Sequence, residues 1–210
     1  MNKEIRYIAT ELRADAESRV IEGYAITFNT DSQNLGGFIE TIESGAVTPE
    51  LIRKSDIKLL YNHNENSGII ARAKRGVGTM DISIDDKGVY FKTTVPNTSL
   101  GNDVLESIKR GDIDACSFAF NCIEGGDSWD KAGKTYKRTI KQFNELFDFS
   151  VVLTPAYQAT TVSARCLDKV KELELQELLE IDSEAEQLEA RKKASEFEVY
   201  YSKVVKQYLK

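Results

Sequence analysis

Short apolar runs rich in Ile, Val, Tyr, Phe and Thr alternate with clusters of Gly, Asn and Asp along residues 1–165. Runs of this length that end at turn-forming residues are typical of β-strands joined by turns. One junction, Asp86-Lys87-Gly88, supplies the turn residues of a hairpin. The pattern predicts strands over residues 6–12, 19–29, 56–62, 78–86, 88–95, 114–124, 134–144 and 146–154, with a polar loop over 124–134.

Two segments carry helix signals instead. Residues 48–55 begin with Thr48 as an N-cap and Pro49 at the first helical position. Residues 100–112 place apolar side chains at helical spacing and end at Gly111. We therefore predict an α+β, mainly β fold, in which a closed or nearly closed antiparallel β-barrel of about six to eight strands is flanked by these two helices.

The composition changes after Arg165. Residues 167–210 contain no Gly and no Pro and are dominated by Glu, Leu, Lys and Ala, with apolar residues at mostly helical spacing. We predict a β-barrel domain over 1–165 and a long helical tail over 166–210, helical at least from Leu167 to Glu180. The tail either packs on its own domain or serves as an arm for self-association or a partner.

Composition and charge exclude several classes of protein. A hydrophobic content of 41% with nine Phe and nine Tyr argues against disorder. A net charge of −6 gives no support for nucleic-acid binding, and the short basic stretch at residues 72–75 is interpreted as a solvated loop. No apolar run approaches the ~20 residues of a membrane span, and the first residues lack the apolar region of a secretory signal. We expect no membrane association and a cytoplasm-like compartment.

Cysteine and histidine usage bears on metal binding. The three cysteines, Cys116, Cys122 and Cys166, have no C-x-x-C spacing, and the chain has a single histidine. In a reducing compartment these thiols are expected to stay reduced, and a His/Cys metal cluster is close to excluded. A carboxylate-only site remains open, and we expect no cofactor.

The single histidine, His63, lies in "IKLLYNHNEN", where a predicted strand ends in a polar cluster. A lone histidine in such a place is usually a turn residue without a chemical role. The alternative is a general base, which requires a nucleophile within hydrogen-bond reach.

Two other residues are candidates for the partners of such a base. Ser117 lies in the predicted strand "ACSFAF", either as a small residue of a tight β-layer or as a nucleophile, and its neighbour Cys116 would face the core. Asp148 interrupts an apolar strand, where a buried carboxylate is costly unless it is paired. It lies on an exposed strand face, pairs with a lysine, or orients His63 toward Ser117.

Six phrases of the sequence, taken in order, resemble one known family. They are "IEGYAITFNT", "GGFIETIESGAVTPELI", "IKLLYNHN", "DDKGVYFKTTVPNT", "LESIKRGDIDACSFAF" and "FDFSVVLTPAYQATTV". Over roughly residues 19–165 the chain resembles the prohead (procapsid maturation) serine proteases of tailed phages, which are distant relatives of the herpesvirus assemblins. The match rests on the order and spacing of the phrases, since none of them is specific alone.

The resemblance implies a role for each candidate residue. Ser117 would be the nucleophile, His63 the base, and Asp148 the acidic third member, where the family more often has Glu. Ala119 replaces a glycine of the family's phrase, so the site must tolerate a Cβ there. Arg72 is a candidate for a supporting cation.

The implied function is that of a prohead maturation serine endopeptidase without a cofactor. It would cleave capsid and scaffold proteins, and itself, in the host cytoplasm inside the assembling procapsid. We expect self-association or partner docking through the tail, and self-cleavage in the junction 160–169. Two alternatives stay open: a non-catalytic, capsid-associated scaffold or binding module, and a different serine hydrolase such as an esterase.

Overall fold

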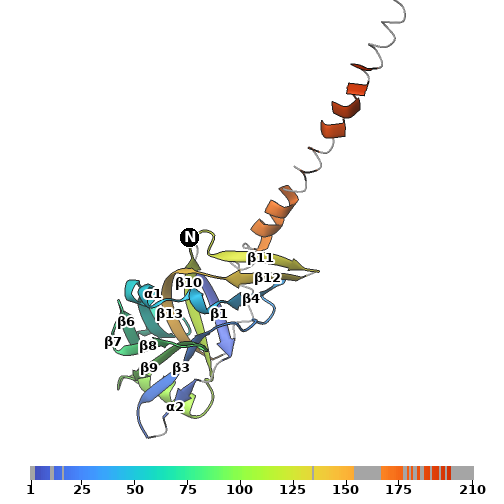
Figure 1. Ribbon diagram of the computed structural model, residues 1–210. Helices are drawn as coiled ribbons and strands as arrows, with labels where there is room; N and C mark the ends of the chain where they lie inside the picture. Colours follow the sequence, from blue (N-terminus) through green and yellow to red (C-terminus); the bar gives the residue numbers. More distant parts are fainter. Residues whose placement is uncertain are drawn as a thin grey trace, which may run out of the picture. The chain divides into compact units, whose positions relative to one another are not determined.

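The structure is a computed structural model of the chain. It describes residues 3–9, 12–15, 17–133, 135–153 and 167–176, and further residues within 179–199, namely 179, 181, 184, 187–189, 191–193, 195–196 and 198–199. The chain divides into two compact units, Met1–Arg165 and Cys166–Lys210. Strands dominate the first unit and helix the second, so the fold is α+β and mainly β, as predicted (Figure 1).

The described strands of the first unit form three sheets. The largest has six strands, in the order β1 (Glu4–Ala9), β10 (Ala115–Cys122), β13 (Phe143–Val152), β5 (Asp56–Tyr61), β6 (Ala71–Lys74) and β7 (Val77–Gly78). The second has four, in the order β2 (Arg13–Ala14), β3 (Val20–Thr27), β9 (Gly88–Thr94) and β8 (Met80–Ile84). The third has three, in the order β11 (Asp127–Ala132), β12 (Thr135–Ile140) and β4 (Phe38–Ile42).

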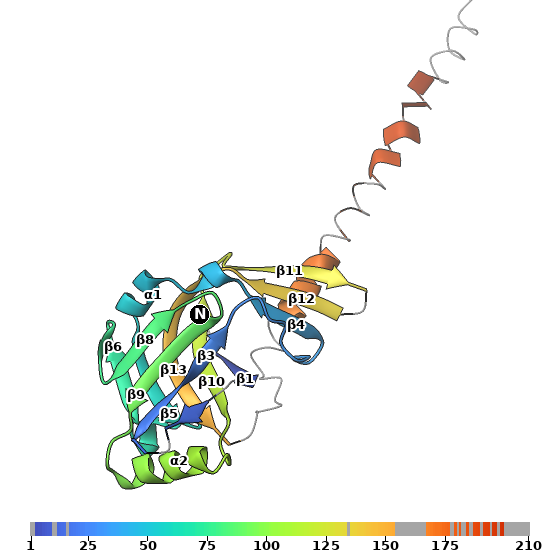
Figure 2. The same cartoon turned by 60° about the horizontal axis from the view of Figure 1, so that its bottom comes forward.

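Both predicted helices are present, at different ends of the sheets (Figures 1 and 2). Helix α1 (Pro49–Lys54) begins after Thr48, whose hydroxyl accepts the Leu51 N–H at 3.1 Å. Helix α2 (Ser99–Lys109) begins after Thr98, whose hydroxyl accepts the Gly101 N–H at 3.1 Å. These caps satisfy backbone donors that the first helical turn leaves free. Two short 3₁₀ turns, η1 (Ser44–Ala46) and η2 (Glu65–Ser67), lie in the connections.

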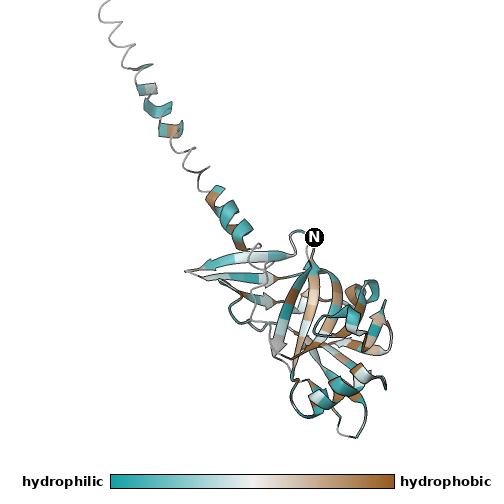
Figure 3. Cartoon of the chain, turned by 180° about the vertical axis from the view of Figure 1, so that it is seen from behind, coloured by the Kyte–Doolittle hydropathy of each residue, from teal (hydrophilic) through white to brown (hydrophobic). Residues whose placement is uncertain are grey.

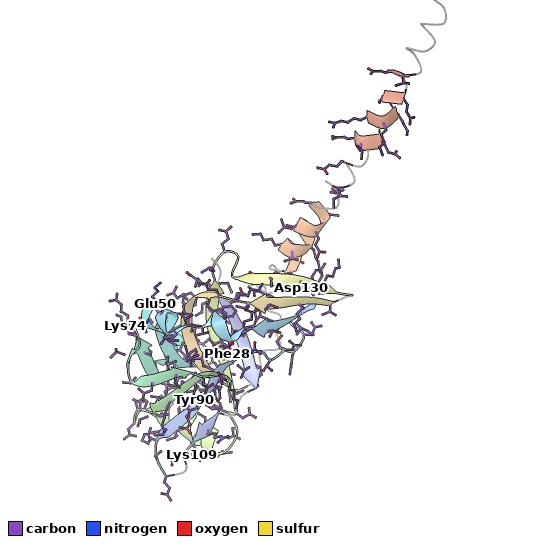
Figure 4. All side chains as sticks on the ribbon, in the orientation of Figure 1. Phe28, Glu50, Lys74, Tyr90, Lys109 and Asp130 are labelled. Atoms are coloured by element: carbon purple, nitrogen blue, oxygen red, sulfur yellow. The ribbon has the colours of Figure 1, made fainter. Side chains whose placement is uncertain are left out.

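The hydrophobic core lies between the six-stranded and the four-stranded sheets. The rings of Phe91 on β9 and Phe149 on β13 join the two sheets, with centroids 6.2 Å apart. On β10 the alternate residues Cys116 and Phe118 belong to this core, as does Phe28, which is labelled in Figure 4. The predicted orientation of Cys116 toward the core is therefore confirmed, and Ser117 lies on the other face of the strand.

The prediction of a closed antiparallel barrel is wrong. The described strands form three separate sheets with open edges. Two pairings are parallel, β13 with β5 and β12 with β4. Each parallel pair joins strands that are far apart in the sequence, and the alternation of apolar residues carries no information on strand direction.

Two predicted loops are strands. Within residues 124–134, β11 pairs antiparallel with β12. None of the described side chains from Asp127 to Lys131 is fully buried, so the strand has no apolar pattern to indicate it. The basic stretch at 72–75 lies mostly in β6, where Ala71 and Ala73 are buried. Alanine gives too weak an apolar signal for a strand to be identified from the sequence.

The second unit is helical wherever it is described. Residues 167–176 and 179 are helical, as predicted for Leu167 to Glu180 where the structure describes that range. Leu173, Leu175 and Leu179 are each at least half exposed, and Figure 3 shows isolated hydrophobic positions along a largely hydrophilic helix. No helix among the described residues is long and apolar enough to cross a membrane.

Candidate active site

The structure brings His63, Ser117 and Asp148 together. His63 Nε2 lies 2.6 Å from Ser117 Oγ, and His63 Nδ1 lies 2.5 Å from Asp148 Oδ1. The residues come from neighbouring parts of the six-stranded sheet: Ser117 from β10, Asp148 from β13, and His63 from the turn after β5. The first contact has the length of a hydrogen bond between a base and its partner, and the second is shorter than an ordinary hydrogen bond.

An unusual backbone turn places the imidazole. Asn62 and His63 have φ angles of 50° and 56°, in the left-handed region that residues other than glycine rarely adopt. Strand β13 and the residue after it hold this turn through three hydrogen bonds. They are Asn62 N–H to Val151 O at 3.1 Å, His63 N–H to Ser150 Oγ at 3.1 Å, and Leu153 N–H to Asn62 Oδ1 at 3.3 Å. The strand that carries Asp148 thus also fixes the position of His63, and strain of this kind is concentrated at functional sites.

Asp148 is 1% exposed and is fully engaged. Its Oδ1 accepts a hydrogen bond from Ser150 Oγ at 3.0 Å in addition to facing His63, and its Oδ2 lies 2.9 Å from Lys3 Nζ. Burial acts to raise the Asp148 pKa, but the hydrogen bonds and electrostatic interactions with His63 and Lys3 outweigh it and hold the pKa below its usual value. The carboxyl group is therefore ionised at neutral pH. An exposed strand face is excluded, and Asp148 contacts both the imidazole and a lysine.

The Ser117 hydroxyl lies between an imidazole and a backbone carbonyl. Its side chain is 3% exposed, and Oγ donates to the Arg6 carbonyl oxygen at 2.9 Å. Strand β1 provides this carbonyl because Tyr7 pairs with Ser117 across β1 and β10. Ala119, two residues along β10, is completely buried, so the position accommodates a Cβ.

The sequence did not indicate Ser150, Lys3 or the Arg6 carbonyl as parts of the site. Ser150 could have been found, since it lies two residues after Asp148 on one strand and so shares its face. Lys3 is a single charge near the chain terminus and carries no such signal. Arg72 was expected as a supporting cation, but its guanidinium pairs with Asp56 at Nε–Oδ1 2.6 Å on the neighbouring strand.

A buried group of charged side chains anchors the strand β1. It consists of Glu4, Arg6, Glu40 and Arg138, each at most 5% exposed. Arg6 Nε and Nη2 donate to the two Glu40 oxygens at 2.7 and 2.8 Å, and Arg6 Nη2 donates to Glu4 at 2.6 Å. Arg138 donates to Glu4 at 2.6 Å and to Glu40 at 3.0 Å. These contacts tie β1 to β4 and β12, and so fix the carbonyl that faces Ser117.

The cysteines and carboxylates do not form a second reactive centre in the described chain. Burial raises the pKa of Cys116 to about 12 and that of Cys122 to about 12, so both remain protonated thiols. Among the described residues, no group of three or more His, Cys, Asp or Glu side chains is placed to hold a metal ion.

A serine hydroxyl in contact with an imidazole, which in turn contacts a buried carboxylate, is the arrangement of the serine hydrolases. The sequence model of one family, described as Caudovirus prohead serine protease, matches residues 4–174. The chain belongs to this family, which confirms the resemblance and extends it to β1. No curated protein and no solved structure matches the chain. Membership implies a serine peptidase that acts on the phage prohead.

Proposed function

We propose that the chain is a prohead maturation endopeptidase in which Ser117 is the nucleophile, His63 the general base and Asp148 the orienting acid. The observation that carries this proposal is the continuous line of contacts from Ser117 Oγ through the imidazole to Asp148, at 2.6 and 2.5 Å. A non-catalytic scaffold has no need of a histidine held in a strained turn against a buried serine.

Hydrolysis would proceed through an acyl-enzyme. The neutral imidazole carries its proton on Nδ1, toward Asp148, which leaves Nε2 free to accept the proton of Ser117. The Ser117 hydroxyl turns from the Arg6 carbonyl to Nε2, and its oxygen attacks the scissile carbonyl carbon. The peptide C–N bond then breaks as His63 returns the proton to the leaving amine. A water, deprotonated by His63, attacks the acyl carbon, and the released Ser117 oxygen takes the proton back.

The substrates would be capsid and scaffold proteins, cleaved in the host cytoplasm within the assembling procapsid. Family membership supports this proposal, since the prohead contains these proteins at high local concentration. Self-cleavage in the junction 160–169 is a further part of it, and residues 160–166 of that junction lie outside the described residues.

Covalent labelling tests the nucleophile directly. A fluorophosphonate reacts with a serine that an adjacent base activates, so mass spectrometry of the treated protein should show one adduct on Ser117. Ser117→Ala should abolish the adduct, and His63→Ala should nearly abolish it. Ser83→Ala is the control, because Ser83 lies on β8 of the four-stranded sheet, and it should leave the adduct intact. Labelling that persists in Ser117→Ala would refute the assignment. Cleavage of capsid protein without turnover of small esters would then separate a protease from an esterase.

Asp148→Asn is expected to lower kcat/KM by about 10⁴-fold, less than the loss of the nucleophile or base. The amide can donate a hydrogen bond to His63 Nδ1, which favours the tautomer whose Nε2 carries the proton and cannot accept one from Ser117. Initial rates on a protein substrate measure the effect. Asp56→Asn is the matched control, because Asp56 pairs with Arg72 and makes no contact with the imidazole in the described structure. A rate equal to wild type would remove Asp148 from the mechanism.

The tail is proposed to mediate self-association or docking to a capsid or scaffold partner. Leu173, Leu175, Leu179 and Ile181 are at least half exposed in it, and removing this apolar surface from water would favour association with another surface. Deleting residues 167–210 should leave peptidase activity largely intact but lower the mass measured by light scattering or the uptake into particles. Unchanged mass together with unchanged uptake would make the tail a local packing helix.

A further inference from the structure

The residue before β1 contacts the proposed orienting acid. Lys3 Nζ lies 2.9 Å from Asp148 Oδ2, and it also lies 5.4 Å from the centre of the Phe147 ring. The lysine side chain is 42% exposed, whereas Asp148 is 1% exposed. An exposed cation therefore reaches a carboxylate that solvent does not.

The other groups around Asp148 leave its Oδ2 to Lys3. Ser150 on β13 and the imidazole from the turn after β5 occupy the Oδ1 side of the carboxylate. On β5, Lys58 pairs with Asp148 in the strand register, but its ammonium contacts Glu65 at 2.6 Å. Among the described residues, Lys3 thus supplies the cation that contacts Asp148 on its remaining oxygen.

The position of Lys3 is fixed by its neighbours in the chain. Glu4, the next residue, and Arg6, two residues further on, are held in the buried charge group. The same strand offers the Arg6 carbonyl to Ser117 at 2.9 Å. The segment Lys3–Arg6 therefore touches the site at both the acid and the nucleophile, and its anchoring limits how far the ammonium can move.

We propose that Lys3 is a positioning residue, which holds Asp148 ionised with Oδ1 turned toward His63 and thereby keeps the imidazole able to accept a proton at lower pH. Its importance for turnover rests on the proposed function, but its effect on the imidazole does not. Without the ammonium, a proton is taken up more readily by the coupled His63–Asp148 pair, because a neighbouring positive charge no longer opposes it. A protonated imidazole cannot act as the base for Ser117.

The single histidine allows a direct measurement. Proton–nitrogen NMR of the full chain gives imidazole signals that can come only from His63. In Lys3→Met the midpoint of the imidazole titration should rise by about 0.5 pH unit, a shift in the range of a partly exposed charge pair. Lys3→Arg keeps the cation and should keep the wild-type midpoint.

Lys137→Met is the matched control. Lys137 also lies 2.9 Å from a carboxylate, that of Asp31, and its side chain is 45% exposed. Its partner, however, is not in the site, so the His63 midpoint should not change. An unchanged midpoint in Lys3→Met, or an equal shift in Lys137→Met, overturns the proposal.

The rate of protein cleavage gives the second readout. On the acidic limb of the profile of kcat/KM against pH, Lys3→Met should be about threefold slower than wild type, since a shift of about 0.5 pH unit changes the fraction of free base by that factor. The rate at higher pH should be nearly unchanged, and a general loss at every pH would indicate a structural role and overturn the proposal. If Ser117→Ala cleaves as fast as wild type, the proposed function fails, while the NMR midpoints still decide the role of Lys3.

Discussion

Ser117→Ala should reduce the cleavage of a protein substrate by about 10⁶-fold, and His63→Ala should reduce it by a similar factor. Without the hydroxyl there is no oxygen to form the acyl-enzyme, and without the imidazole nothing removes its proton. Activity that remains would come from substrate binding and from stabilisation of the transition state by other groups. Single-turnover cleavage of purified capsid protein, followed by mass spectrometry, measures rates over this range.

The double variant Ser117→Ala/His63→Ala serves as the internal control. Residues that act as one unit are non-additive, so the double variant should be no slower than either single one. Neither substitution removes a side chain of the apolar core, so the temperature of thermal unfolding should change little. Wild-type cleavage by either single variant would contradict the assignment, and additive losses would show that the two residues act separately.

The three candidate residues could be picked out from the sequence because their signals are local, but their roles followed only from the family resemblance. His63 follows an apolar strand, Ser117 alternates with core residues, and Asp148 interrupts an apolar run. Each of these patterns is visible within about ten residues of sequence. Period-two alternation also placed Cys116 and Ser117 on opposite faces of one strand, which the structure confirms for the core side.

The arrangement of the strands could not be predicted in the same way. The parallel pairing of β13 with β5 joins residues such as Asp148 and Lys58, which lie far apart in the chain. A parallel and an antiparallel neighbour present the same alternation of side chains, so the pattern did not distinguish three sheets, two of them with a parallel pair, from one antiparallel barrel. The left-handed turn at Asn62 and His63 was equally hidden, because hydrogen bonds from β13 hold it rather than a glycine.

The buried charged residues were the feature that the sequence indicated least. Glu4, Arg6 and Glu40 are charged residues of the kind that usually face solvent. The apolar alternation of their strands gives no sign that they are buried. Only the pairing of β1 with distant strands makes them interior. Charged residues are almost never fully buried unless they are paired, and the partner of Arg6 lies 34 positions away in the sequence.

Glu40→Ala is expected to lower the free energy of unfolding by about 3–5 kcal/mol, the cost of leaving buried charges without a partner. Glu40 accepts hydrogen bonds from Arg6 at 2.7 and 2.8 Å and from Arg138 at 3.0 Å. Removing it leaves two buried guanidinium groups with donors unpaired and with less negative charge to balance them. Urea denaturation followed by circular dichroism measures the change.

Glu50→Ala is the control for the chemistry of the substitution. Glu50 lies on α1, where it is labelled in Figure 4, and it pairs with Arg53 at 2.8 Å. Both side chains are more than half exposed, so the loss should be much smaller than that of Glu40→Ala. Replacing Arg6 together with Glu40 by apolar residues should cost less than Glu40→Ala, because no unpaired charge then remains. Equal losses of unfolding free energy in Glu40→Ala and Glu50→Ala would mean that water reaches the buried charge group. A large loss of unfolding free energy in Glu40→Ala that is smaller in the double variant would instead identify unpaired charge as the cause. The same charge group holds β1, and with it the Arg6 carbonyl, against Ser117.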